Sequence, residues 1–314
     1  MKKHGWRFDR FIHNYIYFKF YYPYVRFVYY LFLFLSSRLS WFKPMNAVIS
    51  MAIHRYHAKV LSFRDARKIL TLNEDVRAVS DRNKCIVPFK YAHRIIFENP
   101  AEIAVMDCPC KKTLGDKEEN INSCIAVGGT LVSFWLEHCG DKYHARRISQ
   151  DDAIGIITRF RSMGYLTQAF FKVATGGQTG VICNCHPDTC VSLRASRMMK
   201  RFDPRFSQSV SSGYSIRRNE SACAYCGACV RVCPVSCIDL DPERRTRSYD
   251  ANECLGCEIC VEHCPSGALE SFIDSGKPAP LDIDAVKREE EEGRSSCGRQ
   301  GCGIFSADHG NRFC

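Results

Sequence analysis

The stretch that decides the C-terminal fold reads "CAYCGACVRVCP" at residues 223–234, and it returns as "CLGCEICVEHCP" at residues 254–265. Each copy has the spacing Cys-x2-Cys-x2-Cys-x3-Cys-Pro, and the second copy begins 31 residues after the first. Three thiolates at this spacing can wrap one face of an iron–sulfur cubane, because soft sulfur ligands hold iron that carboxylates and amides bind poorly. Four-cysteine zinc sites also use Cys-x2-Cys pairs, but they do not need four thiols in one run followed by proline. The repeat therefore predicts two iron–sulfur clusters in one small module.

This segment, residues 214–273, resembles the bacterial-type two-cluster ferredoxins. The resemblance implies crossed ligation, in which the fourth cysteine of each run binds the cluster of the other run. It assigns one [4Fe-4S] cluster to Cys223, Cys226, Cys229 and Cys264, and the other to Cys254, Cys257, Cys260 and Cys233. Clusters of this kind exchange single electrons, so the module implies an electron carrier or a subunit of an oxidoreductase in anaerobic metabolism. We expect redox proteins as donor and acceptor, and the sequence identifies neither.

The residues between and after the two runs predict the secondary structure of the module. The segment "IDLDPERRTRSYDAN" alternates in character on either side of a Pro-Glu-Arg-Arg turn, which predicts a hairpin. We expect short helical segments at "VSCIDL" and "SGALES", which follow the two cluster-binding runs. Cys237 occupies the repeat position that Ala268 holds in the second half, and we interpret it as a small buried residue rather than a ninth ligand.

A second group of cysteines lies upstream, in a region that the sequence predicts to be a mixed α/β domain. Two strand-like runs, "IAVMDCPC" and "TGVICNCHPDTC", each lead into Cys-x-Cys. If these strands are neighbours in one sheet, their ends bring four thiols together at one edge. The candidate ligands of a third site, an iron–sulfur cluster or a zinc ion, are Cys108, Cys110, Cys124, Cys183, Cys185 and Cys190. The alternative is a set of structural or redox-active thiols, because free cysteines are common in protein cores.

Residues 56–194 are also similar to uncharacterised cysteine-rich iron–sulfur proteins of anaerobic bacteria. In those proteins a Cys-x-Cys segment, an isolated cysteine and a Cys-Asn-Cys segment precede a two-cluster ferredoxin module. Related members often carry additional adjacent cysteines in the stretch where this chain has His186 and Asp188. The similarity brings no established reaction, so two other functions stay open. One is a reductase with a catalytic upstream site, in which His186 or Asp188 moves a proton; the other is an interaction module held together by zinc.

The scaffold around these cysteines carries ordinary helix and strand signals. Ser62 with Asp65, and Ser149 with Asp152, have the spacing of capping boxes, and Gly164 marks the end of the second helix. The segment "FKYAHRIIFENP" predicts a helix that stops before Pro100, and "EIAVMD" predicts a short buried strand. The fold class that we expect is α+β, with a cysteine-rich mixed domain followed by the two-cluster domain.

The N-terminal segment, residues 1–44, is aromatic and basic. Residues 15–35 contain twelve Tyr or Phe, and residues 1–44 carry eight Lys or Arg against one acid. The uncharged run from Phe27 to Ser37 is about half of the roughly 20 residues that a spanning helix needs, so a membrane span is not expected. Aromatic rings and basic side chains favour the membrane–water interface. The segment therefore predicts peripheral contact with the cytoplasmic membrane face; a partner-docking surface and a plain buried helical hairpin are the alternatives.

Composition sets the remaining limits. The 314 residues contain 20 cysteines, and the N-terminus lacks the features of a secretory signal, so we expect a reducing cytoplasm in which clustered thiols bind metal. Seven of the ten net positive charges lie in residues 1–44, and arginines gather around the first cluster run, which favours an acidic redox partner over nucleic acid. The expected parts are 1–44, a cysteine-rich domain at 45–205, the ferredoxin-like domain at 214–273, and a tail at 274–314 with linker character and loosely spaced cysteines.

Overall fold

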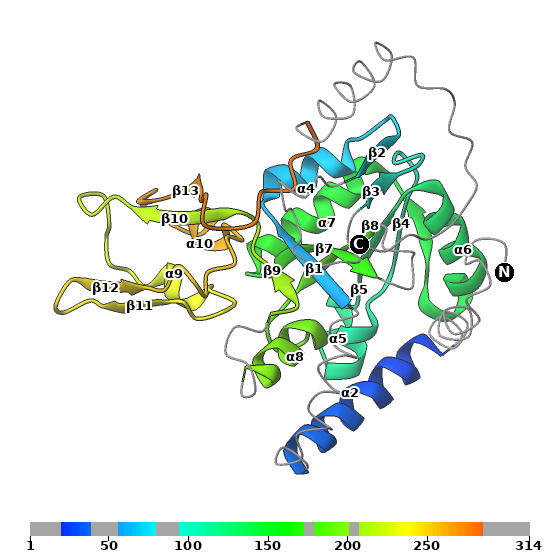
Figure 1. Cartoon of the computed structure of the whole chain (residues 1–314), viewed down its shortest axis with the longest axis horizontal. Helices are drawn as coiled ribbons and strands as arrows, with labels where there is room; N and C mark the ends of the chain where they lie inside the picture. The colour runs from blue at the N-terminus through cyan, green and yellow to red at the C-terminus, as the bar shows by residue number, and fades with distance from the viewer. Residues whose placement is uncertain (1–19, 39–55, 80–93, 173–178, 201–206, 285–314) are drawn as a thin grey trace, which may run out of the picture.

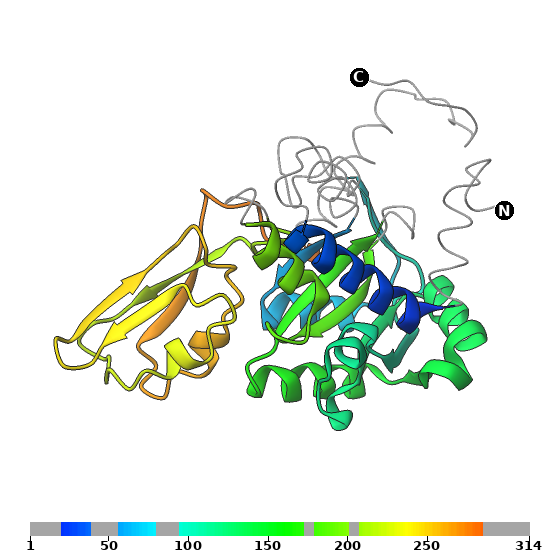
Figure 2. The ribbon, with the colours of Figure 1, turned by 90° about the horizontal axis from the view of Figure 1, so that it is seen from below.

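The computed structural model describes residues 20–38, 56–79, 94–172, 179–200 and 207–284. It has two lobes, one built on a large sheet and one that contains the cysteine repeat (Figures 1 and 2). Both lobes combine helices with mostly antiparallel strands, which confirms the expected α+β class. Cys85 and the three cysteines of residues 285–314 lie outside the described residues, as does most of the N-terminal segment.

The first lobe is a seven-stranded sheet in which only the last pair of neighbouring strands is parallel. In spatial order its strands are β6 (Arg146–Ile148), β4 (Ile103–Asp107), β5 (Asn122–Val127), β8 (Thr179–Cys185), β7 (Leu166–Lys172), β1 (Tyr56–Leu61) and β9 (Ser209–Val210). The expected strand in "EIAVMD" is β4, and all five of its residues are buried. Because β4 and β8 both run antiparallel to β5, their C-terminal ends lie at the same edge of the sheet.

Helices cover both faces of this sheet. One face packs on α4 (Phe63–Leu70) and α7 (Gln150–Ser162). The other face packs on α6 (Gly129–Tyr143) and α8 (Val191–Met199), and it also contacts α2 (Tyr21–Arg38) and the short α5 (Pro109–Leu114). A single turn of 3-10 helix, η1 (Glu118–Asn120), leads into β5. The side chains of β5 and β8 alternate between the two faces, and their cysteines all point to the second one.

Both predicted helix starts are confirmed. The Ser149 side chain accepts a hydrogen bond from the Asp152 N–H, and the Asp152 carboxylate accepts one from the Ser149 N–H, which is a complete capping box for α7. Ser62 accepts from the Asp65 N–H at the start of α4. The helix expected before Pro100 is wrong over its described part, because Arg94–Phe97 forms strand β3, which pairs with β2 (Val76–Val79) in a separate hairpin. Residues 89–93 of that expected helix lie outside the described residues.

The second lobe repeats one strand-and-turn unit twice. Strand β10 (Tyr214–Arg218) pairs with β13 (Leu269–Ile273), and β11 (Ile238–Asp241) pairs with β12 (Thr246–Tyr249) in the predicted hairpin. The short helices α9 (Ala228–Arg231) and α10 (Ile259–Glu262) lie inside the two cysteine runs. The helical segments expected after the runs are therefore wrong, because their later residues belong to β11, which pairs with β12, and to β13, which pairs with β10.

The second lobe is joined to the first at both ends. The chain enters it after β9, and it returns to place Leu281 and Ile283 in the core beneath α4. Lys68 of α4 forms an ion pair with Asp282, and Lys59 of β1 donates to the Pro278 carbonyl. The linker interpretation therefore fails for the start of the expected tail, which belongs to the core of the sheet lobe.

Candidate metal centres

The six candidate cysteines of the sheet lobe come together at the edge where β4 and β8 end. Cys108 caps α5 directly after β4, and Cys190 caps α8 a few residues after β8. Both strands belong to one sheet, and β5 lies between them, so β4 and β8 are not direct neighbours. The thiols still meet, because Cys124 on β5 bridges the gap and stands in register with Cys183 on β8.

The six thiols form one chain of sulfur contacts. The Sγ atoms of Cys124 and Cys183 are 3.9 Å apart. The contacts run in the order Cys110, Cys108, Cys124, Cys183, Cys185 and Cys190. Contact with the Cys108 thiol, together with burial, raises the pKa of Cys124, whereas contacts with Cys110 and Cys124 and the charge of Lys111 lower the pKa of Cys108. The Cys108 thiol is thus disposed to ionise, because the Cys110 and Cys124 thiols can donate hydrogen bonds to it.

Lys111 is a buried cation beside this chain of thiols. Its side chain is 1% exposed, and the Nζ atom donates to the Asn120 carbonyl at 3.0 Å and to the Ser123 hydroxyl at 2.8 Å. The Nζ atom also lies 3.6 Å from the centre of the Phe160 ring. Within the described residues no carboxylate forms an ion pair with it. A buried ammonium needs a compensating negative charge, and Lys111 contributes favourably to ionisation of Cys108.

His186 and Asp188 lie on the outer side of the same site. The His186 ring stacks on the Tyr165 ring at 4.9 Å, and its Nδ1 atom accepts from the Asp188 N–H at 3.2 Å. Tyr165 in turn donates to the Asp116 carboxylate, which also accepts from the Thr189 hydroxyl at 2.7 Å. Burial and the Asp116 charge raise the pKa of Tyr165 to about 12. The contacts with Tyr165 and Asp188 therefore fix the orientation of the His186 imidazole, which lies at the edge of the site.

The outer end of the second lobe holds an apolar cavity. The four cysteines that the resemblance assigns to the first cluster all line it, although Cys264 belongs to the second run: Cys223, Cys226, Cys229 and Cys264. Arg218, whose side chain is 11% exposed, has its Nη1 atom 3.9 Å from the Cys223 sulfur. Arg247 also lines the cavity, and its Nε and Nη2 atoms have no hydrogen-bond partner in the described part of the chain. The cavity offers four thiols and cationic N–H donors, which fits an anionic iron–sulfur cluster.

Of the other four cysteines, Cys257 packs in the hydrophobic cluster shared with the sheet lobe, whereas Cys233, Cys254 and Cys260 lie in the core of the second lobe. Cys237 stands between two of them, with its sulfur 3.5 Å from that of Cys233 and in contact with that of Cys254. These contacts lower the pKa of Cys233 and of Cys254 to about 6. The Tyr249 hydroxyl also contacts the Cys254 sulfur. Cys237 is 8% exposed, which agrees with its interpretation as a buried residue, but it is closer to two candidate ligands than the sequence indicates.

The two groups of thiols share one hydrophobic cluster. Leu255, Cys257 and Ile259 of the second run pack in the same buried cluster as four of the upstream cysteines. Arg161 of α7 fastens this contact: its guanidinium donates to the Cys257 carbonyl at 2.6 Å and binds Glu262 of α10 through two nitrogens at 2.5 to 3.0 Å. His263 approaches the Ser162 carbonyl at 3.1 Å. No solvent layer separates the second run from the sheet lobe at these contacts.

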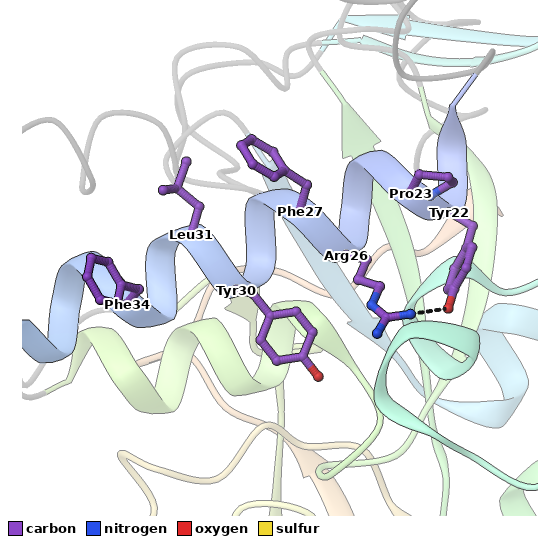
Figure 3. A pocket seen from close by; sticks show the side chains of 7 residues that line it. All are labelled: Tyr22, Pro23, Arg26, Phe27, Tyr30, Leu31 and Phe34. Atoms are coloured by element: carbon purple, nitrogen blue, oxygen red, sulfur yellow. Dashed lines mark hydrogen bonds between the residues drawn. The ribbon is translucent and has the colours of Figure 1, made fainter.

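Helix α2 crosses the face of the sheet that holds the thiols. Its inner side carries Tyr29, which is 9% exposed and lies beneath the Arg194 guanidinium of α8. Its outer side carries an apolar stripe at helical spacing, and Figure 3 shows Phe27 and Leu31 projecting on the same side of the helix. The exposed large side chains of this helix and its first turn are Phe20, Phe27, Tyr30, Leu31, Leu33 and Phe34. Among the described helices, none is long and apolar enough to cross a membrane.

All cysteines in the described ranges are free thiols. In those ranges, no group of three or more histidine, cysteine, aspartate or glutamate side chains is arranged as a ligand set for a single metal ion, in the C-terminal repeat or in the sheet lobe. Cys139 is buried in α6, where burial raises its pKa to about 11, and it takes no part in the chain of sulfur contacts. Sequence reasoning missed two polar groups, Lys111 and Arg161, because a lysine or an arginine inside a helix is usually solvated.

Comparisons with known proteins identify the C-terminal part. Residues 222–268 match the 4Fe-4S dicluster domain family. The chain is 41% identical over 64 residues to YccM of Escherichia coli (strain K12), which is named for electron transport, and this covers 20% of the chain and 17% of the relative. It is 36% identical over 52 residues to the pyruvate synthase subunit PorD of Methanothermobacter marburgensis, covering 17% and 58%. It is 38% identical over 56 residues to the hydrogenase-2 operon protein HybA of Escherichia coli O157:H7, covering 17% and 16%.

These matches establish a 4Fe-4S dicluster domain at the C-terminal part, as the cysteine repeat predicts. The relatives are named as an electron-transport protein, a hydrogenase-2 operon protein and a pyruvate synthase subunit. The domain supports iron–sulfur clusters and a role in electron transfer with redox partners. The chain spans 17%, 58% and 16% of the length of the three relatives named above, and the family match at residues 222–268 covers the repeat rather than the sheet lobe.

Proposed function

We propose that this protein relays single electrons through two [4Fe-4S] clusters in the second lobe and holds a third, thiolate-bound metal centre in the sheet lobe, which joins the relay if it is an iron–sulfur cluster. The observation that carries the proposal is the chain of six upstream thiols, which lies in the same hydrophobic cluster as the second cysteine run. The iron–sulfur clusters, when bound, would supply one-electron redox chemistry with little rearrangement. The chain's own residues hold them, exclude water and fix their separation.

The ligands would follow the crossed pattern. Support for it comes from the cavity in which Cys264 of the second run joins the first three cysteines of the first run. In the core of the second lobe, the Cys237 sulfur contacts the sulfur of Cys233, from the first run, and that of Cys254, from the second run. Cys257 and Cys260, which are 8% and 7% exposed, complete that second set. Each set thus takes three thiols from one run and one from the other.

For the upstream site, a metal–thiolate centre is favoured over neutral thiols by charge. Lys111 is buried among neutral groups, so a centre with net negative charge would compensate its ammonium. Four thiolates around Zn²⁺, or around a [4Fe-4S] core, give such a net charge. Six thiols are more than either centre needs, which leaves room for a reductase in which His186, at the rim, transfers a proton to a substrate.

The proposed path of the electrons would have an outer end, at the first cysteine set, and an inner end, at the second. The outer set includes Cys226, the exposed cysteine of the repeat, and it is surrounded by arginines on β10, α9 and the β11–β12 hairpin. This basic end suits a redox partner with an acidic surface. The inner set packs on the sheet lobe through Leu255 and Cys257, within the hydrophobic cluster that holds the upstream thiols. Electrons would therefore be exchanged with the partner at the arginine-rich end.

The test is the metal and acid-labile sulfide content of anaerobically purified full-length protein, combined with electron paramagnetic resonance after reduction. Two clusters account for roughly eight iron atoms. The variant Cys124→Ser/Cys183→Ser should keep these and lose any metal beyond them, because it removes the central pair of the sulfur chain. Cys139→Ser, which lies in the same hydrophobic cluster outside that chain, should keep everything.

The outcomes separate the candidates. Iron and sulfide beyond two clusters, lost in the double variant, identify a third cluster, and turnover of a small substrate that the same variant abolishes would favour the reductase. One zinc without further sulfide favours the zinc-held interaction module. If the double variant has the same metal and sulfide content as the wild type, the upstream site is refuted and the protein is a two-cluster ferredoxin fused to a sheet domain.

For the apolar stripe of α2 we propose peripheral contact with an anionic membrane surface. The stripe is exposed along Phe27, Tyr30, Leu31 and Phe34, and the helix carries two arginines and no acidic residue. Aromatic side chains at the interface and basic side chains near anionic head groups both favour this placement. The opposite side of the helix is anchored on the sheet lobe, so docking would hold the thiol-bearing face of the sheet toward the membrane.

Phe27→Glu/Phe34→Glu is expected to weaken binding to vesicles that contain phosphatidylserine by at least about tenfold, because each ring contributes roughly 1.5–3 kcal/mol when buried. Co-sedimentation at fixed salt measures it. Met163→Glu, at an exposed apolar position on the far side of the sheet lobe, is the control and should bind like the wild type. Wild-type protein that stays in the supernatant, or a double variant that sediments as well as the wild type, would contradict the membrane contact.

A further inference from the structure

A buried amide stands beside the upstream thiols without a partner. Gln168 lies in the middle of β7 and is 0% exposed. Neither its Nε2 nor its Oε1 atom has a hydrogen-bond partner within the described ranges. Leaving such a group unsatisfied is costly, because the amide has lost its hydrogen bonds to water and gained none in return. A buried polar side chain in this condition indicates a partner that the polypeptide alone does not provide.

The register of the sheet says where that partner lies. Gln168 is the cross-strand neighbour of Cys183, and Cys183 is the cross-strand neighbour of Cys124. Residues that face each other across antiparallel strands project to the same side, with Cβ atoms about 4.5–5.5 Å apart. On the other side of Gln168 the cross-strand neighbour is Val60, which offers no polar side-chain atom. The polar direction open to the amide is therefore toward the two thiols.

The residues along β7 confirm this orientation. Leu166 and Phe170, two positions to either side of Gln168, belong to the same hydrophobic cluster as the thiols. Thr167 points to the opposite face, where its hydroxyl accepts a hydrogen bond from the Arg161 guanidinium. Of Leu166, Gln168 and Phe170 on this face of β7, only Gln168 has a side chain that can form hydrogen bonds. Its position in the interior of a strand also fixes its backbone.

We infer that the Gln168 Nε2–H group donates a hydrogen bond to a sulfur atom of the metal–thiolate centre held by the cysteines of β5 and β8. The inference rests on the proposed third site and assigns Gln168 as a positioning residue, not as a ligand. A hydrogen bond from an amide to a thiolate or sulfide stabilises the more negative state of the centre. The Gln168 hydrogen bond therefore stabilises the negative charge of the centre and slows the release of its metal. Lys111 supplies the nearby positive charge.

The sharp test is Gln168→Leu in the full-length protein, because the substitution keeps the approximate size and removes both polar atoms. In metal-free protein it should raise the unfolding temperature, since an unsatisfied buried amide is replaced by an apolar side chain. In metal-loaded protein it should release the upstream metal to a chelator about 10–100-fold faster, the usual loss when a group that supports the ligands is removed. If the centre is an iron–sulfur cluster, its potential should shift to a more negative value.

Ser209→Ala is the matched control. Ser209 on β9 is 2% exposed with an unpartnered hydroxyl, and β9 lies two strands away from β7. Its replacement should leave the release rate unchanged. If Gln168→Leu changes the stability of metal-free and metal-loaded protein in the same direction, with an unaltered release rate, the inference is overturned. If Cys124→Ser/Cys183→Ser shows no upstream metal to lose, the proposed site itself has failed, and the two failures are thereby distinguished.

Discussion

Replacing Arg161 by methionine is expected to lower the free energy of unfolding by about 3 kcal/mol, at the low end of the range for breaking a buried ion pair. The Arg161 side chain is 2% exposed and holds both the Glu262 carboxylate and the Cys257 carbonyl, so its loss strands two acceptors at the contact between the lobes. The low end applies because Glu262 is one-third exposed and regains water. Urea denaturation of the metal-loaded protein, followed by circular dichroism, measures the change.

Arg159→Met provides the matched comparison on the same helix. Arg159 donates to the Glu119 carbonyl and to the Asn120 side chain at the surface, so its loss should cost less than about 1 kcal/mol. Arg161→Met should also make the second cysteine run more accessible to alkylation once metal is removed, which Arg159→Met should not do. Equal destabilisation by the two variants would mean that Arg161 does not fasten the lobes together.

Cys264→Ala is expected to remove one whole cluster and to leave the other. The crossed pattern assigns Cys264 to the outer cavity, so the variant should lose about half of the iron of the dicluster domain. The remaining paramagnetic signal should be that of the inner cluster, whose ligand Cys257 packs on the sheet lobe. The result would be counter-intuitive from the sequence, because three cysteines of the run that contains Cys264 stay bound.

Cys237→Ala controls for the general effect of removing a thiol from this lobe. Cys237 lies 3.5 Å from Cys233 but is not assigned as a ligand, so both clusters should persist, with a small change in the properties of the inner one. To separate crossed from uncrossed ligation, Cys223→Ala is compared with Cys264→Ala. The crossed pattern requires these two variants to lose the same cluster. Loss of different clusters would refute it.

Local signals in the sequence were sufficient for much of the fold. The cysteine repeat predicts the dicluster domain because ligand spacing is a local property. The hairpin between the two runs and the capping box at Ser149 are confirmed for the same reason. The helix expected at "FKYAHRIIFENP" is wrong because Ile95 and Ile96 are β-branched and find a partner strand in β2, so pairing outweighs a periodicity that a short window cannot resolve.

What the sequence could not supply was the order of strands. Placing β5 between β4 and β8 makes Cys124 the centre of the sulfur chain, whereas its isolated position in the sequence suggests a peripheral role. Gln168 carries no sequence signal at all, since one polar residue in a strand usually faces water. Its meaning depends on a register with Cys183 that only the folded sheet defines. Arg161 is similar, because its partners lie about a hundred residues further along the chain.

The return of Leu281 and Ile283 to the sheet core has a kinetic consequence. A domain carried on one flexible linker can swing, and electron exchange with its neighbour then waits for that motion. Here the second lobe is tied at both ends and clamped in the middle, so the tunnelling distance between the inner cysteines and the upstream thiols is set at folding. Transfer between the lobes should therefore be insensitive to solvent viscosity, and diffusion of the external partner to the arginine-rich end becomes the step that viscosity slows.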